Sequence, residues 1–311
     1  MPIRPSRREA LRTGATVLAG CSLTARAERK ADAPGWIDAH VHIWTDDLKR
    51  YPLAEGFTKA QMKPATFTPA ELFAHCEKSG VRRINLIQMS YYRYDNSYML
   101  DMMAKHPGRF AGTGIVDVSS PDLAEQMRRL RKREVRALRV YPSLAGRKPV
   151  DWLQPEGFET MFKTAAKLNQ AVSCLIRPDS FPELDRMCAR HPDTPVIIDH
   201  MGLVGTSGTV DQKELDALRR LARHKRVMLK VGAFYAFGKA APYDGLLPLV
   251  RAVIEAFGPE RCMWESDCPF QVTNGAGYEA SVALIRDRCD FLSPADKDQI
   301  LRKTAETFFF A

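Results

Sequence analysis

Two histidines, separated by one residue, stand in an apolar run that extends from Trp36 to Trp44, near the start of the region expected to fold. Alternate residues of a β-strand point to the same face, so His40 and His42 are expected to project side by side. Packing gains nothing from two imidazoles on an apolar strand, and each buried ring needs a hydrogen-bond or metal partner. The spacing alone fits either two hydrogen-bonded core histidines or a catalytic or metal-binding pair, and the rest of the chain favours the second reading.

Two further apolar runs end in polar residues. The run that begins at Cys262 reaches Asp267 and is stopped by Pro269, a residue type that is tolerated at strand ends rather than inside strands. The run that begins at Val196 reaches His200. The catalytic groups of a parallel barrel stand at the carboxyl ends of its strands. We therefore predict that Asp267 and His200 join the histidine pair at the mouth of such a barrel.

Short β-rich runs recur eight times, and the predicted strands are residues 36–44, 83–90, 110–118, 135–141, 171–177, 195–200, 227–234 and 262–267. Helical spacing of apolar residues predicts helices between them at residues 69–80, 121–133, 158–169, 180–191, 213–224 and 248–257. This alternation predicts an α/β protein with a single (β/α)8 TIM barrel over residues 36–311. A doubly wound open sheet is the alternative, but it would require a glycine-rich phosphate turn after the first strand, where the chain has none.

The polar strand ends share a pattern with a known family, carried by His40-Val41-His42, Leu86-Ile87-Gln88-Met89-Ser90, Ala137-Leu138-Arg139-Val140-Tyr141-Pro142, Ile198-Asp199-His200-Met201-Gly202 and Trp264-Glu265-Ser266-Asp267-Cys268-Pro269. In this order, the motifs resemble the amidohydrolase-related family, amidohydrolase family 2. Within that family the chain is most similar to the branch of 2-pyrone-4,6-dicarboxylate and sugar lactonases. The resemblance extends over nearly all of the chain beyond Gly35.

The resemblance implies that His40, His42, His200 and Asp267 form the reaction centre. In the wider superfamily such residues hold a divalent metal that activates water. No histidine stands on the predicted fifth strand, and Arg139 occupies the fourth, where a bridging lysine would be sought, so a two-metal site is not expected. One zinc or manganese ion held by the four residues, and a metal-free centre of the kind known in the lactonase branch, both remain open.

The resemblance also implies a reaction: Asp267 acts as general base on a water that opens a lactone of a sugar acid or of a carboxylated ring, while the three histidines polarise the carbonyl and stabilise the oxyanion. A metal-dependent decarboxylase or amide hydrolase of the same superfamily is the first alternative. A tethered binding protein without chemistry is the second, and the presence of all four polar residues argues against it.

Arginines near two predicted strand ends could bind a substrate carboxylate, because a guanidinium group matches its two oxygens. They are Arg139 and, with a weaker case, Arg177, and a salt bridge at the barrel rim is the structural alternative. Ser90 and Tyr51 are further candidates to line the substrate pocket. Lys230 interrupts an apolar strand, so its charge must face the barrel mouth or an internal carboxylate.

Three acidic residues near the motifs have lesser roles in this interpretation. Structural roles are expected for Asp38 and Asp199, which we expect to point away from the histidine face, although Asp199 could instead orient a neighbouring ring. Glu265 is expected on the same strand face as Asp267. It is a lower-ranked candidate for the general base or for a residue that supports the catalytic side chains.

The amino-terminal 27 residues resemble a bacterial twin-arginine export signal, with Arg7 and Arg8 ahead of a short, mildly apolar segment. Cys21 follows Leu-Ala-Gly as in a lipoprotein cleavage box, and cleavage after Ala27 is the alternative. Residues 28–35 would then be a tether. The expected location is the periplasm or, through lipidated Cys21, the membrane surface; a disordered basic tail on a cytoplasmic protein is the other interpretation.

The composition favours a small molecule as the binding partner of this protein. The formal charge is +9, but no basic cluster is interleaved with aromatic residues and no nucleic-acid motif is present. The seven cysteines include no Cys-x-x-Cys pair of the kind that binds metal. We expect a small carboxylate or lactone substrate and no nucleic acid, and nothing in the sequence identifies the lactone or the oligomeric state.

Overall fold

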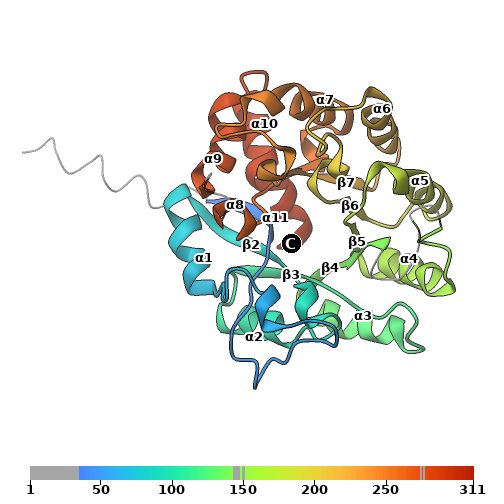
Figure 1. Ribbon diagram of the computed structural model, residues 1–311. Helices are drawn as coiled ribbons and strands as arrows, with labels where there is room; N and C mark the ends of the chain where they lie inside the picture. Colours follow the sequence, from blue (N-terminus) through green and yellow to red (C-terminus); the bar gives the residue numbers. More distant parts are fainter. Residues whose placement is uncertain (1–34, 143–147, 149–150, 274, 276) are drawn as a thin grey trace, which may run out of the picture. The chain divides into compact units, whose positions relative to one another are not determined.

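Eight parallel strands follow one another in sequence order around a single sheet (Figure 1). The computed structural model describes residues 35–142, 148, 151–273, 275 and 277–311. The strands are β1 (Trp36–Val41), β2 (Val81–Ile87), β3 (Phe110–Gly114), β4 (Val135–Val140), β5 (Ala171–Cys174), β6 (Val196–Ile198), β7 (Val227–Gly232) and β8 (Cys262–Glu265). The predicted export signal, Cys21 and the tether lie outside the described residues, apart from Gly35, and stay predictions.

The sheet closes where β8 returns to β1. Val41 forms a parallel bridge with Cys268, and the backbone N–H of Asp267 donates to the carbonyl of His40 at 3.0 Å. The backbone N–H of His42 donates to the carbonyl of Cys268 at 2.8 Å. The eight parallel strands agree with the predicted barrel, and its closure brings β1 and β8 together at their carboxyl ends.

Helices surround the strands: α1 (Pro69–Cys76), α2 (Ser97–Lys105), α3 (Leu123–Lys132), α4 (Glu156–Leu168), α5 (Phe181–Arg190), α6 (Gln212–Leu221), α7 (Leu247–Phe257), α8 (Phe270–Thr273), α9 (Tyr278–Ala283), α10 (Pro294–Asp298) and α11 (Thr304–Phe309). Helices α2 and α8 to α11 have no counterpart among the predicted helices. In α2, three of the buried residues are consecutive and obscure the helical spacing. Within the described part of the chain, no helix has the length and apolarity needed to cross a membrane.

The barrel interior consists of an apolar layer below a polar one. Small and apolar side chains from six strands meet Phe309 of α11 at the end where the strands begin. Along several strands the residue two positions further is charged: Arg139 after Ala137, and Glu265 after Met263. Since alternate residues share a face, the same strands that build the apolar layer must point these charges into the barrel.

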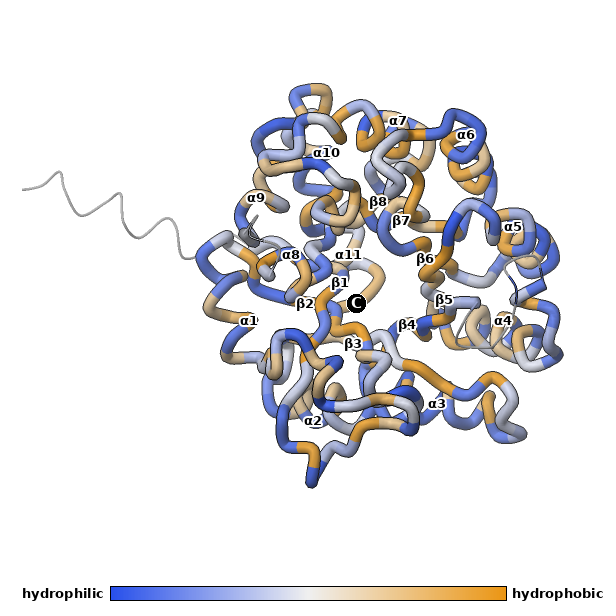
Figure 2. Tube along the Cα trace, in the orientation of Figure 1, coloured by the Kyte–Doolittle hydropathy of each residue, from blue (hydrophilic) through white to orange (hydrophobic). Residues whose placement is uncertain are grey.

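Hydropathy follows the same arrangement along the chain (Figure 2). Strand β6 is hydrophobic throughout and other strands combine hydrophobic with hydrophilic residues, while the surrounding helices alternate between the two kinds. Helices α3, α5 and α6 each bury one face against the barrel and expose charged residues on the other. The polar interior layer therefore lies within a thoroughly apolar wall, where charged groups must find partners from the protein itself.

Close backbone packing beside this layer gives a test of the fold. Gly232 of β7 lies opposite Glu265, and a Cβ atom at position 232 would be 2.0 Å from the Glu265 carbonyl oxygen. We expect Gly232→Ala to lower the free energy of unfolding by about 1–3 kcal/mol, as overpacking does. Gly245→Ala is the control, because its Cβ would meet nothing closer than 3.5 Å. Equal urea-unfolding midpoints for the two variants would contradict this account.

Candidate active site

The four predicted catalytic side chains meet at the carboxyl ends of three strands. His40 is in β1 and His42 follows it, while His200 and Asp267 each lie two residues beyond the end of their strand. All four residues are buried, and Asp267 is the most exposed at 6%. The structure therefore brings the predicted group together in one protected centre.

All eight predicted strands extend beyond the observed strand ends, and the difference matters for the site at β6 and β8. Strand β6 ends at Ile198 and β8 at Glu265, because His200 and Asp267 adopt left-handed backbone angles, with φ of 54° and 59°. Non-glycine residues adopt this region infrequently, and such residues often occur at functional sites. The His200 turn is held by its own N–H, which donates to Glu265 Oε1 at 3.0 Å.

The turn also overturns the prediction that Asp199 points away from the histidine face. Asp199 lies two residues after the interior residue Ile197, so it faces the barrel axis, and the change of backbone direction then brings His200 to the same centre. Asp199 Oδ1 lies 3.7 Å from His40 Nδ1 and accepts a hydrogen bond from Ser173 at 3.0 Å. Alternation predicts the wrong face here because it assumes a strand that continues through His200.

Asp38 has the structural role that was expected. Its Oδ1 accepts hydrogen bonds from the backbone N–H groups of His40 and Ser266, and its Oδ2 accepts one from the Tyr278 hydroxyl at 2.5 Å. This carboxylate therefore links β1 to the chain after β8 from outside the catalytic group.

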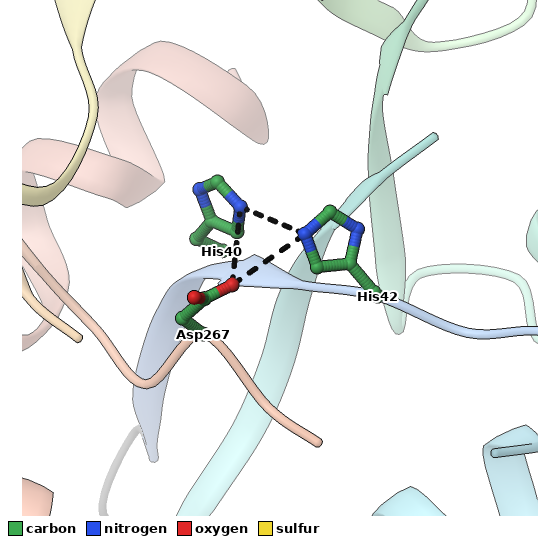
Figure 3. A group of neighbouring side chains, drawn as sticks. All are labelled: His40, His42 and Asp267. Atoms are coloured by element: carbon green, nitrogen blue, oxygen red, sulfur yellow. Dashed lines mark hydrogen bonds and ion pairs between the residues drawn. The ribbon is translucent and has the colours of Figure 1, made fainter. Parts of the chain in front are cut away.

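Three polar atoms converge at the centre of the site (Figure 3). His40 Nε2 and His42 Nε2 are 3.2 Å apart, and Asp267 Oδ1 lies 3.5 Å from the first and 3.4 Å from the second. A tetrahedral zinc ion with bonds of about 2.0–2.1 Å has ligand atoms about 3.3 Å apart. The three side chains could hold a metal ion, and His40, His200 and Glu265 form a second group with suitable atoms.

His42 is held as a neutral ring with its lone pair toward the centre. We assign its proton to Nδ1, because that atom lies 3.0 Å from the carbonyl oxygen of Ile87 and can only donate to it. Burial is the main reason that the pKa of His42 falls from 6.5 to about 4; the Arg139 charge acts in the same direction, and Asp267 opposes it. His42 Nε2 is therefore available as an acceptor or ligand at neutral pH.

Glu265 orients His200. Its Oε1 lies 2.7 Å from His200 Nδ1 and also accepts the His200 backbone N–H. Burial alone would raise the pKa of Glu265, but the charge of His200 and its hydrogen bond lower it to about 2. Burial likewise opposes protonation of His200, yet the Glu265 and Asp267 carboxylates raise its pKa. His200 thus points Nε2 toward Asp267 Oδ2, at 3.9 Å, with Glu265 supporting it from behind.

The two oxygens of the Asp267 carboxylate differ in their hydrogen-bond partners. Oδ2 accepts a hydrogen bond from the Tyr235 hydroxyl at 2.5 Å. Oδ1 is buried and has no hydrogen-bond partner among the described residues. Burial would raise the pKa of Asp267, but the charge of His200 beside it holds the pKa of this carboxylate well below its usual value. An ionised oxygen without a partner, directed at two imidazoles, can accept a proton from water or bind a cation.

Arg139, predicted to bind substrate, is at the edge of this group. Its Nη1 lies 3.2 Å from His42 Nε2, and its Nε lies 3.8 Å from Asp199 Oδ2. The residue is 8% exposed. Arg139 therefore lies beside the reaction centre and also pairs within the barrel, and its role in substrate binding stays a prediction.

The other three predicted substrate-binding residues have no hydrogen bond or ion pair with the catalytic side chains, among the residues that the structure describes. The Tyr51 hydroxyl donates to Asp101 at 2.8 Å, and Arg177 is exposed with Nη1 3.3 Å from the Thr206 hydroxyl. Ser90 begins a short 3₁₀ turn after β2 and is partly buried. Their roles in substrate binding stay predictions.

Two aromatic residues near the centre were missed by reasoning from the sequence. Tyr235 bonds Asp267 from a 3₁₀ turn, Phe234–Phe237, that follows β7. Phe270 follows β8, with its ring centre 5.9 Å from that of His42 and 6.5 Å from that of Tyr235. Their position within five residues of a strand's carboxyl end is the signal that would have identified them, since loops at this face supply the active site of a barrel.

Eight parallel strands with buried histidine and carboxylate side chains at their carboxyl ends have the layout of a TIM-barrel enzyme. The family model described as amidohydrolase matches residues 37–311. The chain belongs to this family, and the predicted resemblance is confirmed.

Curated relatives of this chain include enzymes named for lactones. L-fucono-1,5-lactonase of Burkholderia ambifaria is 28% identical over 282 residues, which cover 88% of this chain and 94% of that protein. The 4-sulfomuconolactone hydrolase of Rhizobium radiobacter is 29% identical, with 75% of each chain covered. A crystal structure of an amidohydrolase from Burkholderia multivorans with bound zinc shares the fold, with a TM-score of 0.74, 22% identity, and 88% and 98% of the two chains covered.

The pKa of His42 predicts how stability responds to acid. Because the folded protein resists protonating His42 until about pH 4, while the unfolded chain takes up the proton near 6.5, stability is lost as the pH falls through this range. The shift corresponds to a loss on the order of 3 kcal/mol. In metal-free protein we expect His42→Asn to flatten unfolding free energy against pH between 6.5 and 4, whereas His75→Asn, at an exposed position, leaves the slope unchanged. Parallel slopes for all three proteins would refute the assignment.

Proposed function

We propose that this protein is a hydrolase that opens a lactone of a sugar acid or of a carboxylated ring, with Asp267 as general base. The observation that carries the proposal is the buried, ionised Oδ1 of Asp267, which has no hydrogen-bond partner among the described residues and faces two imidazole nitrogens. The names of the curated relatives, a sugar lactonase and a muconolactone hydrolase, support a lactone as the substrate class.

The proposed reaction divides the work among the side chains already described. Asp267 Oδ1 takes a proton from water as the water oxygen bonds to the lactone carbonyl carbon. His200, His40 and Arg139 supply donors and positive charge to the carbonyl oxygen as it becomes an oxyanion. The ring C–O bond then breaks, and the proton held by Asp267 passes to the departing oxygen, which leaves a hydroxy acid and a regenerated carboxylate.

As an alternative to this metal-free arrangement, we also propose that the centre accepts one divalent ion, zinc or manganese. His40 Nε2, His42 Nε2 and Asp267 Oδ1 would hold it, because their separations match tetrahedral ligand spacing and the carboxylate oxygen otherwise lacks a partner. His200 could complete the set. When bound, such an ion lowers the pKa of a coordinated water and polarises the carbonyl.

The side chains around the centre agree with a ring substrate that carries an anionic or hydroxylated edge. The aromatic rings of Phe270 and Tyr235 lie at one side of the centre. Arg139 lies beside the centre, and its guanidinium group can donate two parallel hydrogen bonds to an anionic group. Arg177, Ser90 and Tyr51 remain candidates for contacts farther from the reacting bond. A decarboxylase or amide hydrolase would use the same buried group, but the names of the relatives favour the lactone.

A panel of lactones tests the proposal directly. We expect purified protein to release acid from at least one sugar-acid lactone or carboxylated-ring lactone, scored by proton release at constant pH. A linear amide and an aromatic carboxylic acid serve as probes for the amide hydrolase and the decarboxylase. Turnover of those probes alone would replace the lactonase assignment, and stoichiometric binding without turnover of any substrate would indicate a binding protein.

The base assignment has its own test in Asp267→Asn. Asparagine tolerates the left-handed backbone at this position and can still accept the Tyr235 hydrogen bond, so the fold should be kept. We expect turnover to fall roughly 10²–10⁴-fold, the contribution typical of a general base. A variant that melts at the wild-type temperature and retains most of its activity would eliminate Asp267 as the base.

The metal proposal predicts a stoichiometry. Zinc is titrated into metal-free protein in competition with a chromophoric chelator, which reports the amount of zinc bound. Binding should saturate at one ion per chain. His42→Asn should weaken that binding strongly, because it removes one of three converging ligand atoms, whereas His75→Asn should not change it. Saturation at two ions, or equal affinity in the two variants, would count against the proposed ligand set.

A further inference from the structure

Lys230 is a fully buried lysine directly beside the catalytic group, and the proposed reaction gives it no task. It is 0% exposed on β7, and its Nζ pairs with Asp199 Oδ1 at 2.9 Å. This contact resolves the sequence question, since the lysine faces an internal carboxylate. Burying an ammonium group is costly even when it is paired. The second contact of the same atom, with His40 Nδ1 at 3.1 Å, suggests what the lysine does.

An ammonium group can only donate hydrogen bonds. The contact with Lys230 is therefore a hydrogen bond only if His40 Nδ1 carries a lone pair, which puts the proton of a neutral His40 ring on Nε2. That proton points at His42 Nε2, 3.2 Å away, which carries a lone pair because His42 Nδ1 donates to the Ile87 carbonyl. Arg139 Nη1 faces the same nitrogen from 3.2 Å as a second donor. Four groups then form one hydrogen-bond chain in a single direction, from Lys230 through both imidazoles to Ile87.

Glu265 competes for the same nitrogen of His40. Its Oε2 also lies 3.1 Å from His40 Nδ1, yet this oxygen has no hydrogen-bond partner among the described residues. If His40 moved its proton from Nε2 to Nδ1, Glu265 could accept it and Nε2 would gain a lone pair. The moved proton would then also face the Lys230 ammonium group, which opposes this tautomer.

We propose that Lys230 is a positioning residue that fixes His40 as the Nε2–H tautomer and thereby weakens divalent-metal binding at His40, His42 and Asp267. In this tautomer His40 presents a hydrogen-bond donor to the centre. A metal ion requires the opposite arrangement, with a lone pair on Nε2 and the proton on Nδ1 toward Glu265. The two partners of Nδ1 therefore set the balance between a donor and a ligand, and this inference does not depend on the identity of the substrate.

The tautomer can be measured in the unmodified protein. Histidine labelled with ¹⁵N distinguishes protonated from unprotonated ring nitrogens by NMR, and His40→Asn assigns the signal. At neutral pH and without metal, we expect His40 to be protonated at Nε2 alone. A His40 ring protonated at Nδ1 alone, or at both nitrogens, would overturn the proposal without any change to Lys230.

Lys230→Met tests the cause. The variant should move the His40 proton to Nδ1 and raise zinc affinity roughly 10–100-fold, the range typical of residues that support a metal ligand. Lys239→Met removes an exposed lysine and controls for a general loss of positive charge. An unchanged tautomer in a folded Lys230→Met protein, or equal affinity gains in both variants, would overturn the proposal. If Lys230→Met fails to fold, Lys230→Met combined with Asp199→Asn removes both buried charges and carries the same expectations.

Discussion

The closure of the barrel between β1 and β8 is the constraint on which the rest of the site depends. One backbone hydrogen bond, from Asp267 N–H to the carbonyl of His40, joins the first catalytic residue to the last across the whole length of the fold. Asp38 strengthens the same junction from outside by accepting backbone hydrogen bonds from both sides of it. Because the proposed base and the first imidazole are fixed through the backbone, their side chains meet without a flexible loop between them.

Charge balance explains why so many ionisable groups can share this interior. Asp199, Glu265 and Asp267 contribute three buried carboxylates, and Arg139 and Lys230 contribute two cations. The raised pKa of His200 adds positive character where Glu265 and Asp267 are closest. Removing one member would leave an opposite charge buried without a partner, which costs more than the pair contributes. The polar layer is therefore better understood as one unit than as separate ion pairs.

Sequence patterns predicted the barrel and its reaction centre through two simple periodicities. Alternation along β1 identified His40 and His42 as neighbours, and strand-then-helix order identified the barrel. The same alternation was wrong for Asp199, because it cannot anticipate that the backbone reverses at His200. Tyr235 was also missed, since it lies in a turn after β7 and nothing in its local sequence indicates contact with Asp267, 32 residues later. Errors thus begin where regular strands end.

The strands and the two residues after each of them carry the proposed chemistry, and the segments farther on carry the side chains proposed to contact substrate. His40, Glu265 and Lys230 belong to regular strands, so their geometry is set by the barrel and its packing. Tyr235 and Phe270 come from the segments that follow β7 and β8, and Arg177 comes from the segment after β5. Loops on a rigid scaffold can vary without disturbing the core. A lactonase built in this way can keep one water-activating centre while the segments after its strands determine which ring is opened.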